Sequence, residues 1–338
     1  MTKKTYNVVI LGATGRVGKE FLSILEQRNF PINQLYLLGS ERSAGKRLRF
    51  AGQSYTVQDA TKFDFKQAEI GLFSAGGSVS AKYAPLAAKA GCVVIDNTSH
   101  FRYDSDVPLV VPEVNVQAIG QYRQRNIIAN PNCSTIQLVV ALKSIYDKVG
   151  ISRINIATYQ SVSGAGQVGI AALDRQSHAF LKKKADSAAT DLWPIAFNVV
   201  PHIDEFQDNG YTREEMKLVW ETRKLFNNNA LQVNATAVRV PVFYGHAEAV
   251  HIETRAKITT AQACELLRTA PGIKLMEDNT YPTPLLQGMG SDSVFVGRVR
   301  EDISHPLGLN LWIVADNVRK GAALNAVQIA EVLIAEYL

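Results

Sequence analysis

The sequence predicts an α/β protein whose first domain is a doubly wound parallel sheet and whose second is α+β, with a mixed, largely antiparallel sheet. Short apolar runs alternate with helical patterns up to about residue 130, which is typical of strands buried on both faces of a parallel sheet. After residue 151 the strands are longer and alternate apolar with polar positions, as strands of an antiparallel sheet do. The length of 338 residues also favours two domains over one.

The first domain is expected to span residues 1–132. Its strands are predicted at 7–11, 35–38, 70–73, 92–95 and 126–129, where apolar residues run together. A helical pattern follows the first strand through Leu25, and an alanine-rich one follows the third strand to about Ala90. Strands and helices therefore alternate as a parallel sheet requires.

The second domain is expected to span residues 133–317. A long helical pattern opens it, and strands with period-two alternation are predicted at 154–159 and 232–242. The last segment repeats apolar residues at helical spacing, so a helix over 318–338 must pack on another surface. We expect it to pack back on the first domain.

The composition excludes several classes of protein. Hydrophobic residues make up 46% and charged residues 20%, an ordinary globular mixture that disfavours disorder and coiled coil. The formal net charge of +5 is too small an excess for the basic face of a nucleic-acid binder. The three cysteines form no CxxC pair, and no apolar run reaches the ~18 residues of a membrane span. With no signal-peptide pattern at the N-terminus, a cytoplasmic protein is expected.

A glycine-rich turn, Gly12-Ala13-Thr14-Gly15-Arg16-Val17-Gly18, follows the first strand and opens the first helix. In this context glycines let backbone amides approach a pyrophosphate at the positive end of a helix, as in Rossmann-type dinucleotide-binding domains. The spacing is GxxGxxG rather than GxGxxG, so a plain tight turn is the alternative. The predicted cofactor contacts are Gly12, Thr14, Gly15, Arg16 and Val17.

The end of the second strand distinguishes between cofactors. Ser40, Arg42 and Ser43 offer a cation and hydroxyl groups that suit a 2′-phosphate, which favours NADP. Glu41 is the argument against it, because an acidic residue here would bind the ribose 2′-hydroxyl of NAD.

A proline turn, Asn130-Pro131-Asn132-Cys133, joins a strand to the long helix. Cys133 should stand at the helix N-terminus, where unpaired amides and the helix dipole stabilise a thiolate. The other two cysteines, Cys92 in an apolar strand and Cys264 in a helical pattern, are interpreted as inert packing residues. Cys133 is therefore the predicted nucleophile.

A nucleophilic cysteine needs a proton-transfer partner. The six candidates are His100, His178, His202, His246, His251 and His305. Spacing alone does not choose among them, and none shows HExxH or comparable ligand spacing, so no metal is expected. His246 follows a strand and a turn glycine, which would present it at a sheet edge. A further glycine-rich turn contains Ser163 and Gly164 and could pass close to a nicotinamide or a substrate.

In these motifs the chain closely resembles the bacterial aspartate-semialdehyde dehydrogenase family. The matching runs are Gly12-Ala13-Thr14-Gly15, Ser40-Glu41-Arg42-Ser43-Ala44-Gly45-Lys46, Phe73-Ser74-Ala75-Gly76-Gly77-Ser78, Ile95-Asp96-Asn97-Thr98-Ser99, Pro112-Glu113-Val114-Asn115, Asn130-Pro131-Asn132-Cys133-Ser134-Thr135, Tyr159-Gln160, Ser163-Gly164-Ala165-Gly166 and Glu221-Thr222. They lie in order over nearly the whole chain, and the cysteine run with the loop after Tyr159-Gln160 is far more specific than the dinucleotide turn.

The resemblance implies an enzyme that makes L-aspartate 4-semialdehyde from L-aspartyl 4-phosphate with NADPH and releases phosphate. This step leads to lysine through diaminopimelate, and to methionine, threonine and isoleucine. The resemblance also implies a homodimer or a homotetramer. By matching position, Cys133 would be the nucleophile, His246 the acid and base, and Gln160 the residue that orients the substrate at the thioester.

The resemblance implies five binding residues as well. Arg239 would clamp the substrate carboxylate, Glu214 would contact the amine, and Lys217 and Arg102 would contact phosphate. Asn317 occupies a position like one that touches the cofactor. Glu214 and Lys217 lie three apart, so a helical ion pair on the surface is the alternative interpretation.

Two positions depart from the family pattern: His100, where a small residue is expected, and Tyr244, where a longer polar side chain is commoner. Two rival functions also stay open. One is reduction of another acyl phosphate, such as N-acetylglutamyl phosphate, whose acetylated amine carries no charge for Glu214. The other is a non-catalytic relative that binds a nucleotide.

Overall fold

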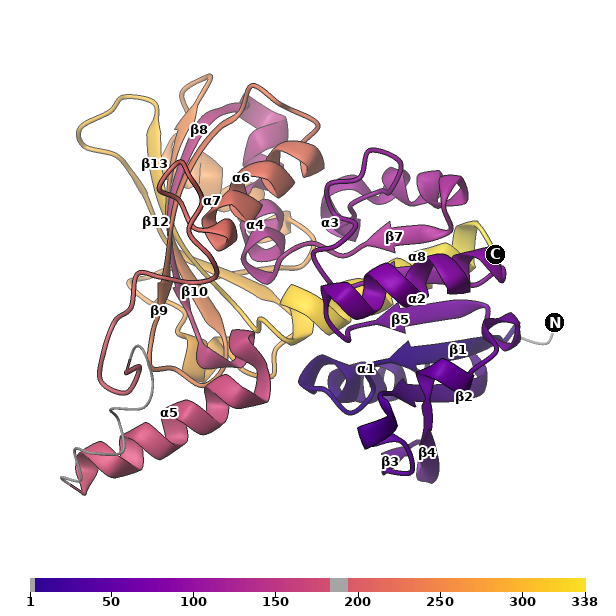
Figure 1. Ribbon diagram of the computed structural model, residues 1–338. Helices are drawn as coiled ribbons and strands as arrows, with labels where there is room; N and C mark the ends of the chain where they lie inside the picture. Colours follow the sequence, from indigo (N-terminus) through magenta and orange to yellow (C-terminus); the bar gives the residue numbers. More distant parts are fainter. Residues whose placement is uncertain (1–3, 183–193) are drawn as a thin grey trace. The chain divides into compact units, whose positions relative to one another are not determined.

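The computed structural model describes residues 4–182 and 194–338, which form two compact units (Figure 1). The first unit comprises residues 4–132 together with 322–338, and the second comprises 133–321. Each is built on one sheet. Among the described residues, no helix is both long enough and apolar enough to cross a membrane.

The first unit contains a seven-stranded sheet in the order β3-β4-β2-β1-β5-β6-β7. Its strands are β1 (Tyr6–Leu11), β2 (Ile32–Gly39), β3 (Arg47–Phe50), β4 (Gln53–Asp59), β5 (Ile70–Phe73), β6 (Val93–Asp96) and β7 (Ile127–Ala129). All neighbouring pairs are parallel except β3 with β4. The chain proceeds from β1 to one side and from β5 to the other, so the sheet is doubly wound as predicted.

Helices cover both faces of this sheet (Figure 1). They are α1 (Arg16–Gln27), α2 (Gly77–Lys89), α3 (Pro112–Asn115) and α8 (Leu324–Glu336), with the 3-10 helices η1 (Glu41–Ser43), η2 (Ala60–Lys62), η3 (Phe65–Gln67) and η4 (Val116–Gln124). Helix α8 contacts α1 and β6, and its apolar residues join the core that holds Val8 and Ile10. Arg28, just after α1, binds Glu331 of α8 with both N–O distances at 2.7 Å.

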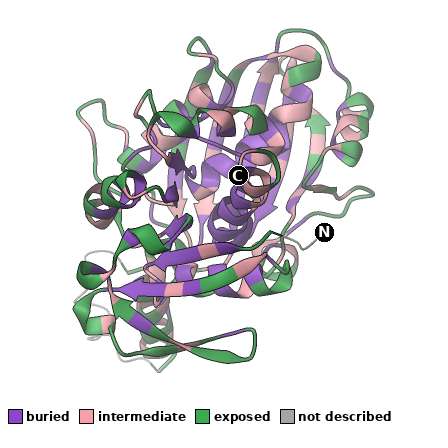
Figure 2. Ribbon diagram, turned by 90° about the vertical axis from the view of Figure 1, so that its right-hand side faces the viewer, coloured by how far each residue is buried: buried purple, intermediate pink, exposed green. Residues whose placement is uncertain are grey.

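Strands β1, β5, β6 and β7 of the first sheet are largely buried, because helices lie on both faces of the sheet. Every residue of β5, β6 and β7 is buried, and Figure 2 shows buried segments running through the sheet, while exposed residues lie on outer helix faces, on loops and on the edge strands β3 and β4. This burial explains the continuous apolar runs of the sequence.

The second unit contains a six-stranded sheet in the order β11-β12-β13-β10-β8-β9. Its strands are β8 (Ile151–Gln160), β9 (Gln232–Arg239), β10 (His246–Thr254), β11 (Ile273–Leu275), β12 (Val294–Glu301) and β13 (Gly308–Ala315). Pairs β8–β9 and β11–β12 are parallel and the other pairs are antiparallel, so the predicted mixed sheet is confirmed.

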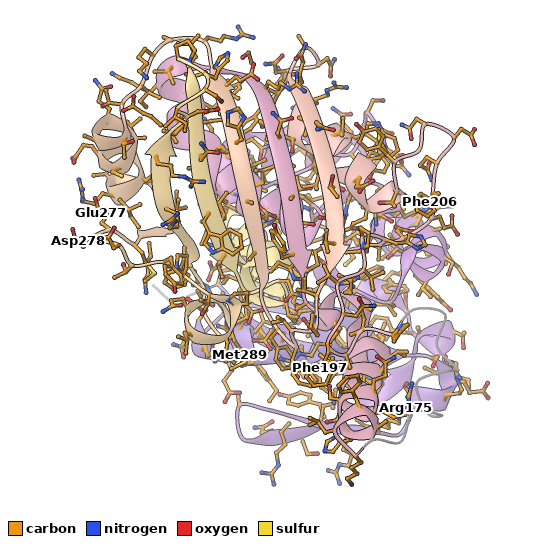
Figure 3. All side chains as sticks on the ribbon, turned by 90° about the vertical axis from the view of Figure 1, so that its left-hand side faces the viewer. Arg175, Phe197, Phe206, Glu277, Asp278 and Met289 are labelled. Atoms are coloured by element: carbon orange, nitrogen blue, oxygen red, sulfur yellow. The ribbon has the colours of Figure 1, made fainter. Side chains whose placement is uncertain are left out.

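Three α-helices cover one face of this second sheet. Helices α4 (Cys133–Val149), α6 (Arg213–Leu225) and α7 (Thr260–Thr269) pack along the same side (Figure 1). Figure 3 looks onto the opposite face, where strands present their side chains outward. The remaining elements are η5 (Val162–Ala165), α5 (Gly166–Leu181) and two π-helical turns, η7 (Pro284–Gly288) and η8 (Arg319–Ala323).

Candidate functional site

The glycine-rich turn between β1 and α1 brings three backbone segments together. Gly12 has a φ of 89°, and a Cβ built there would lie 2.5 Å from the carbonyl oxygen of Ser74, in the loop after β5. A Cβ at Gly18 would collide with the carbonyl oxygen of Gly12. Only glycine fits at both positions, so the turn is a tight cradle beside the N-terminus of α1.

A cavity of about 560 Å³ lies over this cradle in the first unit. Six of the predicted cofactor contacts line it: Gly12, Thr14, Gly15, Ser40, Arg42 and Ser43. Thr14 Oγ1 and Ser43 Oγ lie 3.3 Å apart, which joins the loops after β1 and β2. Such loops meet at the carboxyl edge of a doubly wound sheet, where nucleotides bind.

The residues that line the cavity differ from the predicted cofactor contacts in two respects. Arg16 and Val17 lie in the first turn of α1 and are not among the lining residues, and Arg16 instead lies 3.9 Å from Glu20. The lining includes Glu41, the residue that argued for NAD, and adds residues that sequence reasoning missed: Leu11, Gly39, Asp59, Ala60, Thr61, Ser74, Ala75, Val79 and Tyr83. Several of these follow β4 and β5, so the rule that loops at one sheet edge meet could have found them.

Cys133 is the first residue of α4, as the sequence predicts, and it is partly exposed. A Cβ added at Gly321 would lie 2.9 Å from the Cβ of Cys133, so the chain passes closely over this residue. Burial lowers the pKa of Arg239, and the charges of Glu214 and of a thiolate at Cys133 act in the other direction, so the guanidinium lies close to the sulfur. The helix N-terminus and this cation both stabilise negative charge on the sulfur.

His246 opens β10 and is completely buried. Its Nδ1 accepts a hydrogen bond from the Ser161 N–H at 3.1 Å, so the proton of the neutral ring belongs on Nε2. Within residues 4–182 and 194–338, Nε2 has no hydrogen-bond partner. Burial, and then the charge of Arg239, lowers the pKa of His246 to about 3, so the ring is neutral near pH 7.

The ends of β8 and β9 bring Gln160 and Arg239 side by side in parallel register. Gln160 Nε2 donates to Glu214 Oε1 at 3.1 Å, and Arg239 Nη1 donates to the carbonyl oxygen of Ser161 at 2.7 Å. A Cβ at Gly164 would lie 3.0 Å from Arg239 Nη1 and 3.4 Å from His246 Nε2. The loop after β8 therefore packs directly against both functional side chains, which explains its glycine.

Glu214 and Lys217 form the helical pair that their spacing allows, but the pair is not on the open surface. Lys217 Nζ lies 2.9 Å from Glu214 Oε2 and 2.7 Å from Asp204 Oδ2, and Glu214 is buried. The second acidic partner compensates for the burial of the ammonium group. Glu214 thus faces Gln160 with one oxygen and Lys217 with the other.

Asn317 and Ser163 lie in the same unit. Asn317 Oδ1 accepts from the Ser163 hydroxyl at 3.1 Å, the Ser161 hydroxyl at 3.2 Å and the Gly245 N–H at 3.0 Å. Asn317 therefore ties the loop after β8 to the turn before His246. Sequence reasoning assigned no role to Ser161, whose N–H and hydroxyl oxygen both lie 3.1 Å from His246 Nδ1.

Arg102 belongs to the first unit and is buried there. Its Nε donates to the carbonyl oxygen of Asn130 at 2.9 Å, and its Nη2 donates to that of Asn97 at 3.0 Å. These bonds fix the guanidinium in the segment that leads to Cys133. Its predicted contact with phosphate stays a prediction.

Metal ligation finds no support in the described part of the chain. No group of three or more His, Cys, Asp or Glu side chains that could hold a metal ion occurs among residues 4–182 and 194–338.

Comparison with known proteins gives two family matches and many close relatives. Residues 7–122 match the family described as semialdehyde dehydrogenase, NAD binding domain, and residues 142–320 match semialdehyde dehydrogenase, dimerisation domain. Aspartate-semialdehyde dehydrogenase 2 of Vibrio cholerae is 60% identical over 98% of both chains, and the Aquifex aeolicus enzyme is 53% identical over 98% of this chain and 99% of its own.

Solved structures agree with these matches. Aspartate semialdehyde dehydrogenase II from Vibrio cholerae, complexed with ASA, is 59% identical, with a TM-score of 0.98 over 99% of this chain and 100% of its own. The aspartate semialdehyde dehydrogenase with NADP from Candida albicans is 26% identical, with a TM-score of 0.78 over 98% and 99%. The resemblance in the sequence motifs is confirmed, and the chain belongs to the aspartate-semialdehyde dehydrogenase family of oxidoreductases.

Proposed function

We propose that this chain reduces L-aspartyl 4-phosphate to L-aspartate 4-semialdehyde with NADPH, through a thioester on Cys133. The observation that carries the proposal is one cluster in the second unit. It gathers a cysteine at a helix N-terminus, a histidine with an available Nε2, and an arginine beside both. A nucleophile, an acid and a carboxylate clamp are the groups that this reaction needs.

In the first half-reaction the Cys133 thiolate attacks the acyl carbon. The bond from that carbon to the phosphate oxygen breaks, phosphate leaves with the bonding electrons, and a thioester remains on Cys133. Lys217, in the same unit as Cys133, balances the charge of the departing phosphate. Gln160, fixed by its bond to Glu214, orients the thioester oxygen.

The second half-reaction needs a hydride at the thioester carbon, which a nicotinamide cofactor would supply when bound. His246 holds its proton at Nε2 and stabilises the oxygen as negative charge develops on it. Collapse of the tetrahedral thiohemiacetal then breaks the carbon–sulfur bond and returns the thiolate to Cys133 as the aldehyde leaves. The thiolate is therefore regenerated for the next turnover.

Arg239 is proposed to bind the substrate carboxylate through its planar fork, while Glu214 takes the amine. We expect Arg239→Lys to lower kcat/KM for aspartate semialdehyde by about 100-fold, because a lysine cannot bind the carboxylate with two nitrogens and also reach Ser161. Steady-state kinetics with semialdehyde and phosphate varied separately checks this. Arg213→Lys, at an exposed neighbouring arginine, is the control and should keep wild-type values.

The first unit is proposed to bind NADP through the glycine cradle, with Arg42 on the 2′-phosphate. The cradle fits a dinucleotide because only glycine is sterically allowed at Gly12 and Gly18, which keeps the turn tight beside the N-terminus of α1, where a pyrophosphate can bind. The Candida albicans relative was solved with NADP, which supports the assignment.

Arg42→Ala is expected to raise KM for NADPH by about 10- to 100-fold and to leave KM for NADH nearly unchanged, because a charged hydrogen bond is worth about 1.5–3 kcal/mol. Initial rates with both cofactors test this. Arg49→Ala removes an exposed arginine from β3 and controls for the change in net charge. Equal losses with both cofactors would contradict a role at the 2′-phosphate.

The oligomeric state and the cellular compartment of the protein are proposed from two different observations. The family description of residues 142–320 as a dimerisation domain supports an oligomer, and we propose a homodimer or homotetramer joined through the face of the second sheet opposite α4, α6 and α7 (Figure 3). The cysteines Cys92, Cys133 and Cys264 form no disulfide, which fits a reducing cytoplasm.

One assay tests the proposed function as a whole: phosphate-dependent reduction of NADP⁺ and NAD⁺ with aspartate semialdehyde or N-acetylglutamate semialdehyde. Turnover with aspartate semialdehyde that requires phosphate and prefers NADP⁺ is expected. Turnover with only the acetylated substrate would overturn the roles of Glu214 and Arg239. Absence of turnover with either would favour the non-catalytic alternative.

A further inference from the structure

Glu248 is a carboxyl group that the proposed reaction does not use, yet it lies completely inside the second unit. It follows His246 by two residues on β10, so both side chains point to the same face of the sheet. Within residues 4–182 and 194–338, neither carboxyl oxygen has a hydrogen-bond partner of ordinary geometry. A buried polar group without a hydrogen-bond partner lowers the stability of the fold, so its presence needs a structural or functional explanation.

Gln137 faces Glu248 from helix α4. It lies four residues after Cys133, on the same side of the helix, and α4 packs on β10. Gln137 is completely buried, and its amide atoms also lack a partner of ordinary geometry in the described chain. The amide is nevertheless close enough to lower the pKa of Glu248, so the two side chains meet each other.

Strand β8 supplies a third polar residue beside Glu248 and Gln137. Thr158 lies opposite Glu248 in the antiparallel register, and its hydroxyl accepts a hydrogen bond from Gln160 Nε2 at 3.3 Å. Glu248, Gln137 and Thr158 thus stand one step behind His246, Cys133 and Gln160 on the same three elements. The buried polar residues form a second layer beneath the functional cluster.

The surroundings favour the uncharged acid form of Glu248. Burial raises its pKa well above the ordinary value, and only the Gln137 amide acts in the other direction. Its cross-strand neighbours, Thr158 and Ile313, carry no charge. A protonated carboxyl can donate to Gln137 Oε1 while it accepts from Nε2, whereas a carboxylate can only accept.

We propose that Glu248 is a positioning residue: as a neutral acid paired with Gln137, it fixes the first turn of α4 against the start of β10, and so sets the Cys133 sulfur relative to His246. The inference rests on the roles proposed above for Cys133 and His246. Reciprocal pairing removes the cost of two buried polar groups only when helix and strand keep one relative position. Displacement of a reacting atom by about 1 Å can cost about 100-fold in rate.

The test compares Glu248→Leu, which removes the pairing, with Glu248→Gln, which preserves it as an amide. For Glu248→Leu we expect kcat to fall about 10- to 100-fold, KM to change less than about threefold, and Cys133 alkylation by iodoacetamide to slow across pH 5–9. Mass spectrometry of the Cys133 peptide measures the alkylation. Glu248→Gln should stay within about threefold of wild type in all three and keep the wild-type pH profile, because an amide does not titrate.

Two further variants separate positioning from loss of stability. Thr254→Val removes a buried hydroxyl bond to the carbonyl oxygen of Leu307 at the far end of β10, and is expected to lower the unfolding temperature without changing kcat. The double variant Gln137→Leu/Glu248→Leu replaces both polar groups by apolar ones, so neither is left buried without its partner. It should therefore fold even if Glu248→Leu alone does not. The double variant should lose kcat as the single one does.

The possible outcomes distinguish the positioning role, the pairing as a neutral acid and the proposed function from one another. If Glu248→Leu or the double variant behaves like Thr254→Val in kcat and in alkylation, the positioning role is wrong and Glu248 only packs. If Glu248→Gln loses as much as Glu248→Leu, pairing as a neutral acid is wrong. Turnover by Cys133→Ala would instead overturn the proposed function, and it is measured in the same series.

Discussion

Cys133→Ala is expected to lower kcat by at least about 10⁴-fold while the protein still folds and binds NADPH. The thioester cannot form without the sulfur, and the groups that remain can only hold the substrate. Alanine leaves α4 intact because it is the best helix former, and it is smaller than the residue that it replaces beside Gly321. The measurement is single-turnover kinetics at saturating substrate, with NADPH binding followed by calorimetry.

Cys264→Ala is the matched control for this prediction. Cys264 lies in α7, where partial burial raises the pKa of its thiol, so it lacks the environment of a nucleophile. Its removal should leave kcat at the wild-type value. A Cys133→Ala protein that kept even a tenth of wild-type turnover would contradict covalent catalysis at this residue.

His246→Asn is expected to lower kcat by about 10²- to 10⁴-fold, the range found when a positioned acid or base is removed. Asparagine can place Oδ1 near the position of Nδ1 and still accept from the Ser161 N–H, but it has no group where Nε2 stands. The fold should therefore persist while proton donation is lost. Steady-state kinetics with thermal unfolding as the control checks both parts, and wild-type kcat would contradict the role.

The pH dependence of stability should carry the signature of buried His246. Burial first, and then Arg239, lowers its pKa from 6.5 to about 3. Between these values the unfolded chain binds a proton that the folded protein does not, so the free energy of unfolding must fall as pH falls from 6.5 toward 3. Urea midpoints at pH 7 and pH 4.5 should show a smaller decline in His246→Asn than in wild type.

The parallel sheet was predictable from local pattern because its central strands are buried on both faces. The β3–β4 hairpin was not predicted, because Arg47-Leu48-Arg49 does not look apolar and a strand at the edge needs no apolar run. The signal was the turn between them, Ala51-Gly52, where both residues have positive φ. Two such residues between short strands are typical of a tight hairpin.

The residues of the candidate site likewise form two groups, those that the local sequence predicts and those that it does not. Cys133 and the glycine cradle follow from a few consecutive residues, because a strand, a turn and a helix determine their position. Gln160, Arg239 and Glu214 come from β8, β9 and α6, and only register and helix packing bring them together. Nothing in their local sequence marks them, so the family resemblance supplied them.

The return of α8 to the first unit has a consequence for the order of synthesis. A ribosome that has released β1 to β7 has made most of a nucleotide-binding fold, yet Leu324, Val327, Ile329 and Leu333, which fill its core, are still to be translated. The second unit is continuous in the chain and can close first. The hydrophobic core of the first unit can therefore close only after the last helix has been made, and a stop codon before Leu324 should leave core residues such as Val8 and Ile10 without their packing partners.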